Sequence, residues 1–159
     1  LPVYAGLDLT QRYEPIGGET ILRAVNGRGI KQMTWHKTRV VTSGAGWVPS
    51  GVQSLDFSAS HILACVTPET VPADPLTRQA VLPAARRVDA GHLPYGLAQL
   101  ATGHTVAADV SLVGHVATVN AVAGAVGYQV GYYPLMTAWV NRPSRSGPGN
   151  QWELIAEEV

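Results

Sequence analysis

The sequence predicts an all-β fold, mostly antiparallel, in the form of a β-sandwich or barrel with little helix and with extended arms. Three observations lead to this prediction. Short runs rich in Val, Thr, Tyr and Trp recur along the C-terminal half, Gly and Pro separate these runs, and Asn26-Gly27 stands between two further runs. β-branched and aromatic residues fit a pleated sheet, and Asn-Gly is typical of tight hairpin turns. With 159 residues the chain has the length of one ordinary domain, so we expect a single β domain over residues 1–159.

The first predicted element is a β-hairpin, preceded by an extended N-terminal arm over about residues 1–18. Residues 19–25 lead into Asn26-Gly27, and residues 30–35 lead out of it. Asn-Gly tolerates positive φ at both turn positions, which suits the twist of paired strands. Arg28-Gly29 extends the turn, which favours a loop of four residues over one of two. The second strand is expected to continue, after a break, as far as Val41.

The middle of the chain is rich in residues that interrupt regular structure. Residues 43–51 contain Gly, Ser and Pro and predict a loop, and residues 62–66 predict a short buried strand that Pro68 stops. Five prolines fall between residues 68 and 94. Because proline lacks a backbone donor, a central strand or a long helix is not expected there. We interpret residues 68–94 as an extended segment that crosses the domain or reaches a neighbour.

The C-terminal half predicts most of the sheet. A short helix is expected over residues 95–102. In the strand that follows later, Tyr128, Val130 and Tyr132 alternate with smaller residues and should share one face. If residues 105–110 and 112–119 pair as a hairpin, His104 and His115 can face each other, but two histidines lack the further ligands of a metal site. The remaining expectations are strands over 106–110, 116–122, 127–133, 135–140 and 151–156, with a loop over 142–150.

Composition and charge narrow the classes of function. Charged residues make up 14% of the chain, against about 25% in a typical soluble domain. Such a chain either hides part of its surface against neighbours or is simply rich in Gly and Ala. The net charge of +0 provides no basic field for nucleic acid. The lone Cys65 excludes an internal disulfide, and its apolar surroundings in sequence favour a buried hydrophobic role.

No targeting or membrane segment is expected. The first fifteen residues have neither a basic stretch nor an apolar core like those of a secretory signal peptide. No apolar stretch approaches the ~20 residues that a membrane helix needs. We therefore expect a protein that does not insert into membranes and that is made in a reducing compartment.

No motif for catalysis, cofactor binding or metal binding stands out, so we expect no enzyme and no cofactor. The Gly-x-Ser-x-Gly string of hydrolases does not occur, and Gly44-Ala45-Gly46 lacks the further glycine of a phosphate-binding loop. The carboxylates are scattered, so a catalytic pair could come only from the fold. None of the histidines are spaced as in zinc sites. These histidines are His36, His61, His92, His104 and His115.

The tryptophans raise a second possibility. Trp35, Trp139 and Trp152 lie within predicted strands and are expected in the core. Trp47 lies in the Gly/Pro loop and is expected to be an exposed anchor at an interface. Alternatively, these rings could stack on sugars, as in a carbohydrate-binding β-sandwich module.

Three stretches resemble tail-associated structural proteins of tailed bacteriophages: residues 22–37, residues 43–56, and residues 125–134 together with 152–158. The last is also similar to an immunoglobulin or fibronectin-like strand pair. The resemblance implies a non-enzymatic virion protein, assembled in the host bacterial cytoplasm as part of a tail, baseplate or neck. Its partners would be copies of itself and other phage structural proteins. A capsid decoration or head–tail joining subunit is the alternative. The candidate interface residues are Trp47, Pro49, Arg86, Arg87, Tyr132 and Tyr133.

Overall fold

The computed structural model describes residues 9–146 and 151–159, and it confirms the all-β prediction. Antiparallel strands in three sheets account for most of the described chain, and one four-residue helix, α1 (Ser50–Gln53), interrupts them. None of the sheets closes into a barrel among the described residues. The chain divides into two compact units. Unit 1 contains the chain up to Ile62 and Thr137–Val159, and unit 2 is Leu63–Met136.

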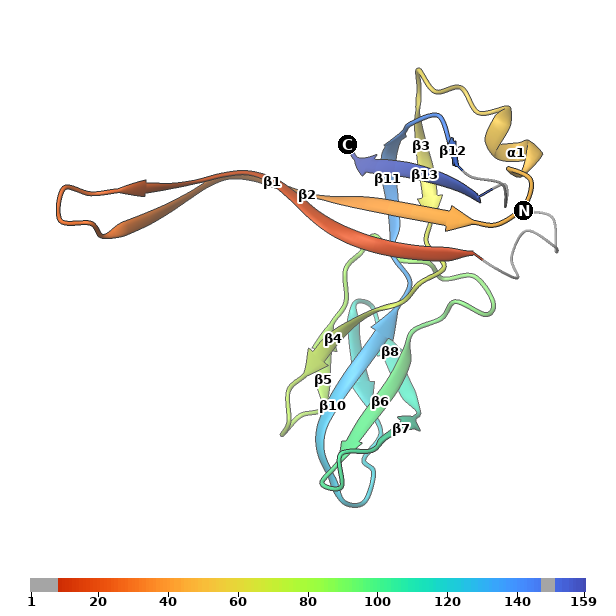
Figure 1. Cartoon of the computed structure of the whole chain (residues 1–159). Coiled ribbons are helices and arrows are strands. Elements are labelled where there is room, and N and C mark those ends of the chain that lie inside the picture. Colours follow the sequence, from red (N-terminus) through yellow and green to blue (C-terminus); the bar gives the residue numbers. More distant parts are fainter. Residues whose placement is uncertain (1–8, 147–150) are drawn as a thin grey trace. The chain divides into compact units, whose positions relative to one another are not determined.

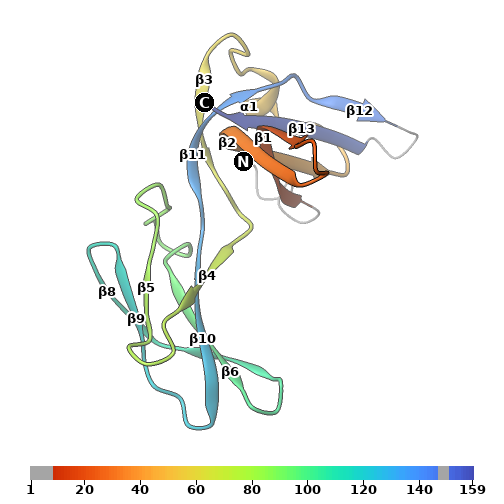
Figure 2. The same cartoon turned by 90° about the vertical axis from the view of Figure 1, so that its left-hand side faces the viewer.

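Unit 2 is a small sandwich of two antiparallel sheets (Figure 2). The four-stranded sheet has the order β4-β10-β6-β7, and the three-stranded sheet has the order β5-β9-β8. The strands are β4 (Glu69–Ala73), β5 (Gln79–Val81), β6 (Tyr95–Leu100), β7 (Thr105–Ala108), β8 (Val110–Val113), β9 (Val116–Val119) and β10 (Ala125–Tyr132).

The core of unit 2 lies between these two sheets. Val130 and Tyr132 of β10 are buried together with Val119 of β9 and Leu82, and Tyr128 packs against this cluster. The predicted shared face of β10 is therefore confirmed. Alternation at the strand period of two places these large side chains on the inner face.

Tyr132 gives unit 2 a pH dependence that can be measured. Burial, with the hydrogen bond that its hydroxyl donates to Glu69 Oε2 at 2.9 Å, raises the pKa of Tyr132 from its usual 10.0 to about 12. In the unfolded chain this phenol ionises near pH 10, so the stabilisation is complete below pH 10 and decreases as the pH rises to 12. We expect Tyr132→Phe to lose less folding stability than the wild type when the pH is raised through this range. Urea unfolding of both proteins at about pH 9 and about pH 11.5 measures it, and an equal alkaline loss in both would contradict the assignment.

The proline-rich segment, which was expected to cross the domain or to reach a neighbour, lies within unit 2. It supplies β4 and β5, which lie at the edges of their sheets. Pro72 lies in β4, which is an edge strand with a single neighbour, β10. The backbone N–H that proline lacks is therefore not needed to pair with a second strand. The prediction that this segment forms no central strand and no long helix is confirmed.

One local prediction for unit 2 is wrong, and one pairing differs from a simple hairpin. The expected helix over residues 95–102 is strand β6, in which Gly96 and Ala98 are buried at alternate positions between β10 and β7. Pairing on both sides decided the conformation of this short segment. Residues 105–110 do not form a hairpin with residues 112–119, because β7 pairs with β6 while β8 pairs with β9. The chain changes sheets at Asp109, between β7 and β8.

The third sheet, sheet A, belongs mostly to unit 1. Its order is β1-β2-β13-β11-β3, and β12 pairs with the free part of β13. Val40, Ala156 and Ala138 are buried in it. The strands are β1 (Thr10–Arg23), β2 (Gly29–Gly44), β3 (Ser60–Ala64), β11 (Leu135–Val140), β12 (Ser144–Ser146) and β13 (Gln151–Glu158).

The predicted hairpin is confirmed with strands longer than expected, but its turn lies at Ala24–Gly27, where Gly27 has a positive φ and Asn26 does not. Gly27 takes a φ of 78°, and its N–H donates to the carbonyl of Ala24 at 2.8 Å. β2 is one continuous strand to Gly44, and its irregularity is a bulge at Thr34, because Gly18 pairs with Trp35 and Glu19 pairs with Met33. The expected N-terminal arm is strand β1 from Thr10 onward, and its residues 1–8 lie outside the described residues.

Candidate assembly surface

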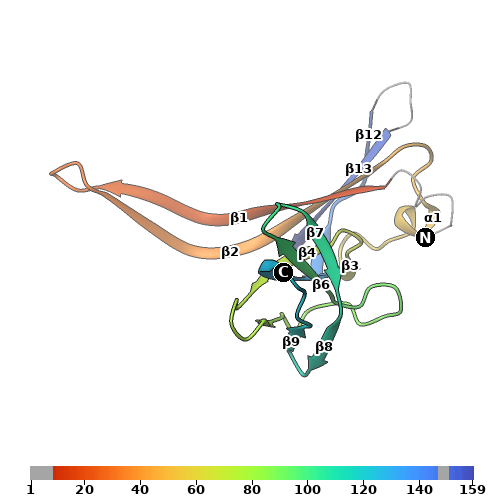
Figure 3. The same cartoon turned by 90° about the horizontal axis from the view of Figure 1, so that it is seen from below.

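The β1–β2 hairpin extends beyond the other strands of sheet A (Figure 1). β13 pairs with β2 only between Arg39 and Gly44, whereas β1 pairs with β2 as far as Gly29. We call residues 17–36, which pair only with each other, the arm. Figure 3 shows its two strands running on together with no third strand beside them. An isolated two-stranded ribbon is only marginally stable in water, so the arm gains stability when another surface covers it.

The arm carries large apolar side chains that are half exposed or more. In a typical monomer, exposed apolar residues are scattered singly, whereas here they follow one another along a single ribbon. These residues are Ile21, Leu22, Val25, Ile30, Met33 and Trp35. Their concentration on one element leaves an extended apolar surface in solvent.

The register places these side chains on both faces of the ribbon. Leu22 pairs directly with Ile30, so these two side chains share one face. Glu19 pairs with Met33 and Ile21 with Lys31 on the opposite face, where Lys31 Nζ lies 2.6 Å from Glu19 Oε2. One face therefore offers an apolar pair, and the other offers apolar side chains around an ion pair.

Two glycines shape the root of the arm. A Cβ on Gly17 would lie 2.7 Å from the backbone oxygen of Trp35, and a Cβ on Gly18 would lie 2.5 Å from its indole Nε1. The absence of these side chains lets the Trp35 ring lie across β1 next to the bulge. Beside it is a hollow of about 400 Å³, lined by Pro15, Ile16, Gly17, Glu19, Lys31, Met33 and His36.

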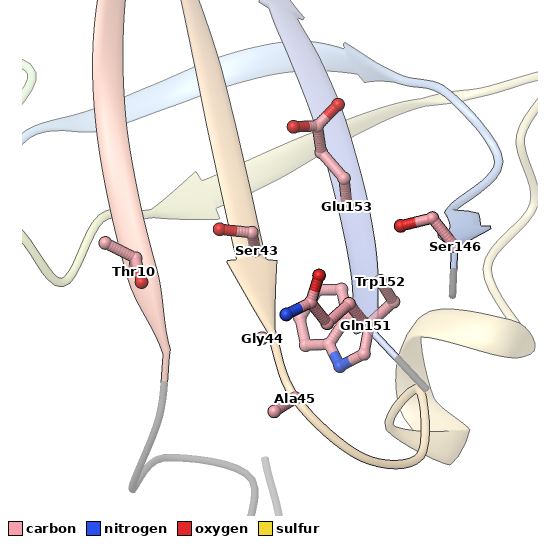
Figure 4. Close-up of a pocket in the computed structure, with 8 residues that line it drawn as sticks. All are labelled: Thr10, Ser43, Gly44, Ala45, Ser146, Gln151, Trp152 and Glu153. Atoms are coloured by element: carbon pink, nitrogen blue, oxygen red, sulfur yellow. The ribbon is translucent and has the colours of Figure 1, made fainter. Parts of the chain in front are cut away.

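A second hollow lies at the other end of the same hairpin, where β1 begins and β2 ends (Figure 4). Its volume is about 380 Å³. The buried Trp152 ring lies against Gly44, where an added Cβ would come within 2.8 Å of the indole. Small polar groups and one carboxylate, that of Glu153, dominate the lining. The lining residues are Thr10, Ser43, Gly44, Ala45, Ser146, Gln151, Trp152 and Glu153.

The loop that leaves this hollow holds the first of the predicted interface residues. Trp47 is 84% exposed, in agreement with its expected position at the surface. Pro49 is buried instead, as is Val48. The loop therefore holds itself in place with Val48 and Pro49 and leaves the indole of Trp47 in solvent.

Arg86 and Tyr132, two further candidates, lie inside unit 2 at 7% exposure each and so present little surface to a neighbour. The Arg86 guanidinium donates to the carbonyls of Pro83 at 2.6 Å and Gly114 at 2.9 Å, and its Nη1 lies 2.9 Å from His115 Nδ1. Because a guanidinium has only donors, that histidine nitrogen acts as the acceptor. Arg86 thus joins two loops, a role that adjacent arginines in a sequence do not reveal.

Arg87 and Tyr133 come together around Asp89 and His92. Arg87 Nε and Nη2 reach the two carboxylate oxygens of Asp89 at 2.9 and 2.6 Å, and this pairing lowers the pKa of Asp89. Arg87 Nη1 also donates to the carbonyl of Cys65 at 2.8 Å. His92 lies 3.0 Å from Asp89 and meets the ring of Tyr133 edge-on. This partly buried cluster holds the strand ends of unit 2 in position.

Of the three tryptophans that were predicted to lie in the core, one is buried and two are exposed. Trp152 is buried as expected, whereas Trp35 and Trp139 are about half exposed. Both exposed rings lie in strands, but alternation places each on the side of its strand that no other layer covers. Cys65 is fully buried, which confirms its apolar role.

Within the described residues, no group of three His, Cys, Asp or Glu side chains is arranged to hold a metal ion. The described helix, α1, is too short to cross a membrane. No protein-family model, curated protein or solved structure matches this chain.

Trp47 provides a direct test of the surface. We expect Trp47→Ala to weaken association with a partner about tenfold or more while changing the unfolding free energy of the chain by less than about 0.5 kcal/mol, because its indole contacts solvent. Analytical ultracentrifugation and urea unfolding measure the two effects. Trp152→Ala is the contrasting control, since loss of this buried ring should lower stability. Equal losses of association and stability in Trp47→Ala would mean that the ring packs in the core.

Proposed function

We propose that this chain is a non-enzymatic structural subunit of a phage tail or baseplate, acting through self-association and through contacts with neighbouring tail proteins. The observation that supports assembly is the arm, a two-stranded ribbon with a row of large apolar side chains in solvent. An element of this kind is suited to lie against another protein.

The energetics favour a docking role for the arm. Full burial of a large apolar side chain contributes about 1.5–3 kcal/mol. Six such residues, even when only partly covered, offer enough free energy to offset the cost of bringing two molecules together. The same residues exposed on a free subunit would promote non-specific aggregation, so a defined partner is the expected state.

Placement in a phage tail comes from the sequence resemblance, and the low charge content agrees with it. With charged residues at 14%, the chain has few groups to keep all of its surface hydrated. Subunits that are covered on several sides by repeated contacts need fewer charges.

The proposal is tested by measuring the mass of the purified chain in solution and by looking for the chain in purified tailed particles. We expect the purified chain to form oligomers or to bind other tail proteins, and we expect it in purified tailed particles. A chain that stays monomeric, binds no other virion protein and is missing from particles would rule out the proposal. Position in the particle separates a tail component from a capsid decoration or head–tail joining subunit.

The exposed tryptophans support a carbohydrate-binding module as a second candidate. Trp35, Trp47 and Trp139 each leave about half or more of the side chain in solvent, and aromatic faces stack on sugars. Titration against a glycan panel, with Trp47→Ala and Trp139→Ala as controls, decides it. The absence of any glycan affinity would remove this candidate.

A further inference from the structure

The partner of the arm can be sought in the distribution of charge along the chain. The arm, residues 17–36, contains the basic residues Arg23, Arg28 and Lys31 and the acidic Glu19, so its net charge is 3 − 1 = +2. The whole chain has a net charge of +0, so the remainder carries −2. The arm is thus electrostatically complementary to the rest of its own chain.

Two ways of joining copies are disfavoured. Arms of like charge repel when they pair with each other. Pairing through the open edges of the hairpin is hindered by Pro15 in β1, which lacks a donor, and by the bulge at Thr34 in β2. Proline and bulges on an edge strand are common devices against edge-to-edge association. These features favour contact of the arm with the body of another copy.

The tip of the arm combines two positive charges with apolar side chains. Arg23 and Arg28 flank the turn, where Val25 is fully exposed and Leu22 pairs with Ile30. Lys31 already pairs with Glu19, while among the described residues Arg23 donates to the carbonyl of Gly27 alone, at 3.4 Å. The tip therefore presents two guanidinium groups beside an apolar surface, which suits a site with a carboxylate and an aromatic ring.

Such a site lies at the opposite end of the same hairpin. Glu153 lines the hollow there and takes part in none of the ion pairs found within the described residues. Trp47 follows Ala45, another lining residue, by two positions and leaves its indole in solvent. Hydroxyl groups of Thr10, Ser43 and Ser146 supply acceptors around the carboxylate.

We propose that the occupant is a second copy of this chain, and that the arm tip of each copy docks on the hollow at Glu153 and Trp47 of the next. This inference rests on the proposed function and names its self-association contact. The two surfaces differ, so the contact is heterologous and joins copies head to tail into a ring or a filament. β1 has 14 residues and spans about 45 Å. We therefore expect successive copies to be spaced by a distance of about this size along the hairpin.

A charge-exchange experiment on the full chain tests the contact. The first variant, Arg23→Glu with Arg28→Glu, has acidic groups at both the tip and the hollow. The second variant, Glu153→Arg, has basic groups at both. We expect each variant alone to associate at least about tenfold more weakly than the wild type, because like charges meet. An equimolar mixture should recover association to within a few-fold of wild type, because each tip then meets a hollow of opposite charge.

Sedimentation velocity of the wild type, each variant and the mixture gives the readout, with thermal unfolding as the check on folding. The tip residues are exposed, so the first variant should unfold at the wild-type temperature. A matched control, Arg142→Glu with Arg145→Glu, makes the same charge change outside the arm and keeps both the basic tip and Glu153, so on its own it should associate like the wild type.

The outcomes separate this inference from the proposed function. If the wild type associates but neither variant weakens it, or if the mixture does not recover, the tip-to-hollow contact is refuted while a structural role remains. If the wild type is monomeric at all concentrations yet is found in particles bound to another tail protein, the second-copy occupant is refuted. If it is monomeric and missing from particles, both proposals fail.

Discussion

Replacing Leu22 and Ile30 together by Ser is expected to lower the association constant about 100-fold. These side chains face each other across the arm and are both half exposed, so they contribute little to the packing of the free subunit. The loss of about 1.5 kcal/mol of burial for each side chain amounts to about 3 kcal/mol, or about 100-fold. Analytical ultracentrifugation across a concentration series measures the change.

The neighbouring cross-strand pair provides the control. Thr20 and Gln32 pair on the same face of the same ribbon, one step closer to the root of the arm. Thr20→Ser with Gln32→Ser keeps the charge and the backbone and should change association by no more than a few-fold. A similar loss in both double variants, or a clear drop in the unfolding temperature of Leu22→Ser with Ile30→Ser, would show that the arm is needed for folding and not for docking.

Gly96→Ala should destabilise unit 2 by about 2–3 kcal/mol, a large effect for one added methyl group. A Cβ at Gly96 would lie 2.7 Å from the carbonyl oxygen of Ala108, 2.8 Å from Val110 Cγ2 and 2.9 Å from Val119 Cγ1. The first of these atoms belongs to the paired strand β7, and Val119 is fully buried. Neither atom can therefore move away from the added methyl group without disturbing the sheet or the core. Urea unfolding followed by far-UV circular dichroism measures the loss.

Gly127→Ala is the matched control in the adjacent strand β10. Its Cβ would find only the side-chain oxygen of Gln99, at 3.7 Å, which is an ordinary contact. We expect it to be neutral within about 0.5 kcal/mol. If Gly96→Ala were as stable as Gly127→Ala, the close packing of β6 between its neighbours would be wrong.

Local residue patterns predicted those parts of the fold that depend on neighbours in sequence. Asn26-Gly27 predicted the hairpin because its turn conformation depends on the two residues themselves. The alternation of Tyr128, Val130 and Tyr132 predicted the inner face of β10, and Pro72 limited its segment to an edge strand. Residues 135–140 form β11 with the expected bounds. In each case the side chain or the backbone of the residue itself restricts the conformation.

Other features depend on which segments pair, and no local pattern carries that information. Residues 95–100 have a weak preference of their own and become a strand because β10 and β7 pair with both edges. Asp109 separates two strands of different sheets, although its sequence context suggests a simple hairpin. Arg86 and Arg87 look alike in sequence, yet one joins loops through carbonyls while the other binds Asp89.

The sequence by itself determined the all-β class, the hairpin turn, the burial of Cys65 and the exposure of Trp47. Only the tertiary structure decided that β13 leaves β2 at Arg39 and that the hairpin continues alone as the arm. The exposure of Leu22, Ile30 and Trp35 follows from that choice. The physical reason is that alternation assigns side chains to the two faces of a strand, whereas only the packing of distant segments determines whether anything covers those faces.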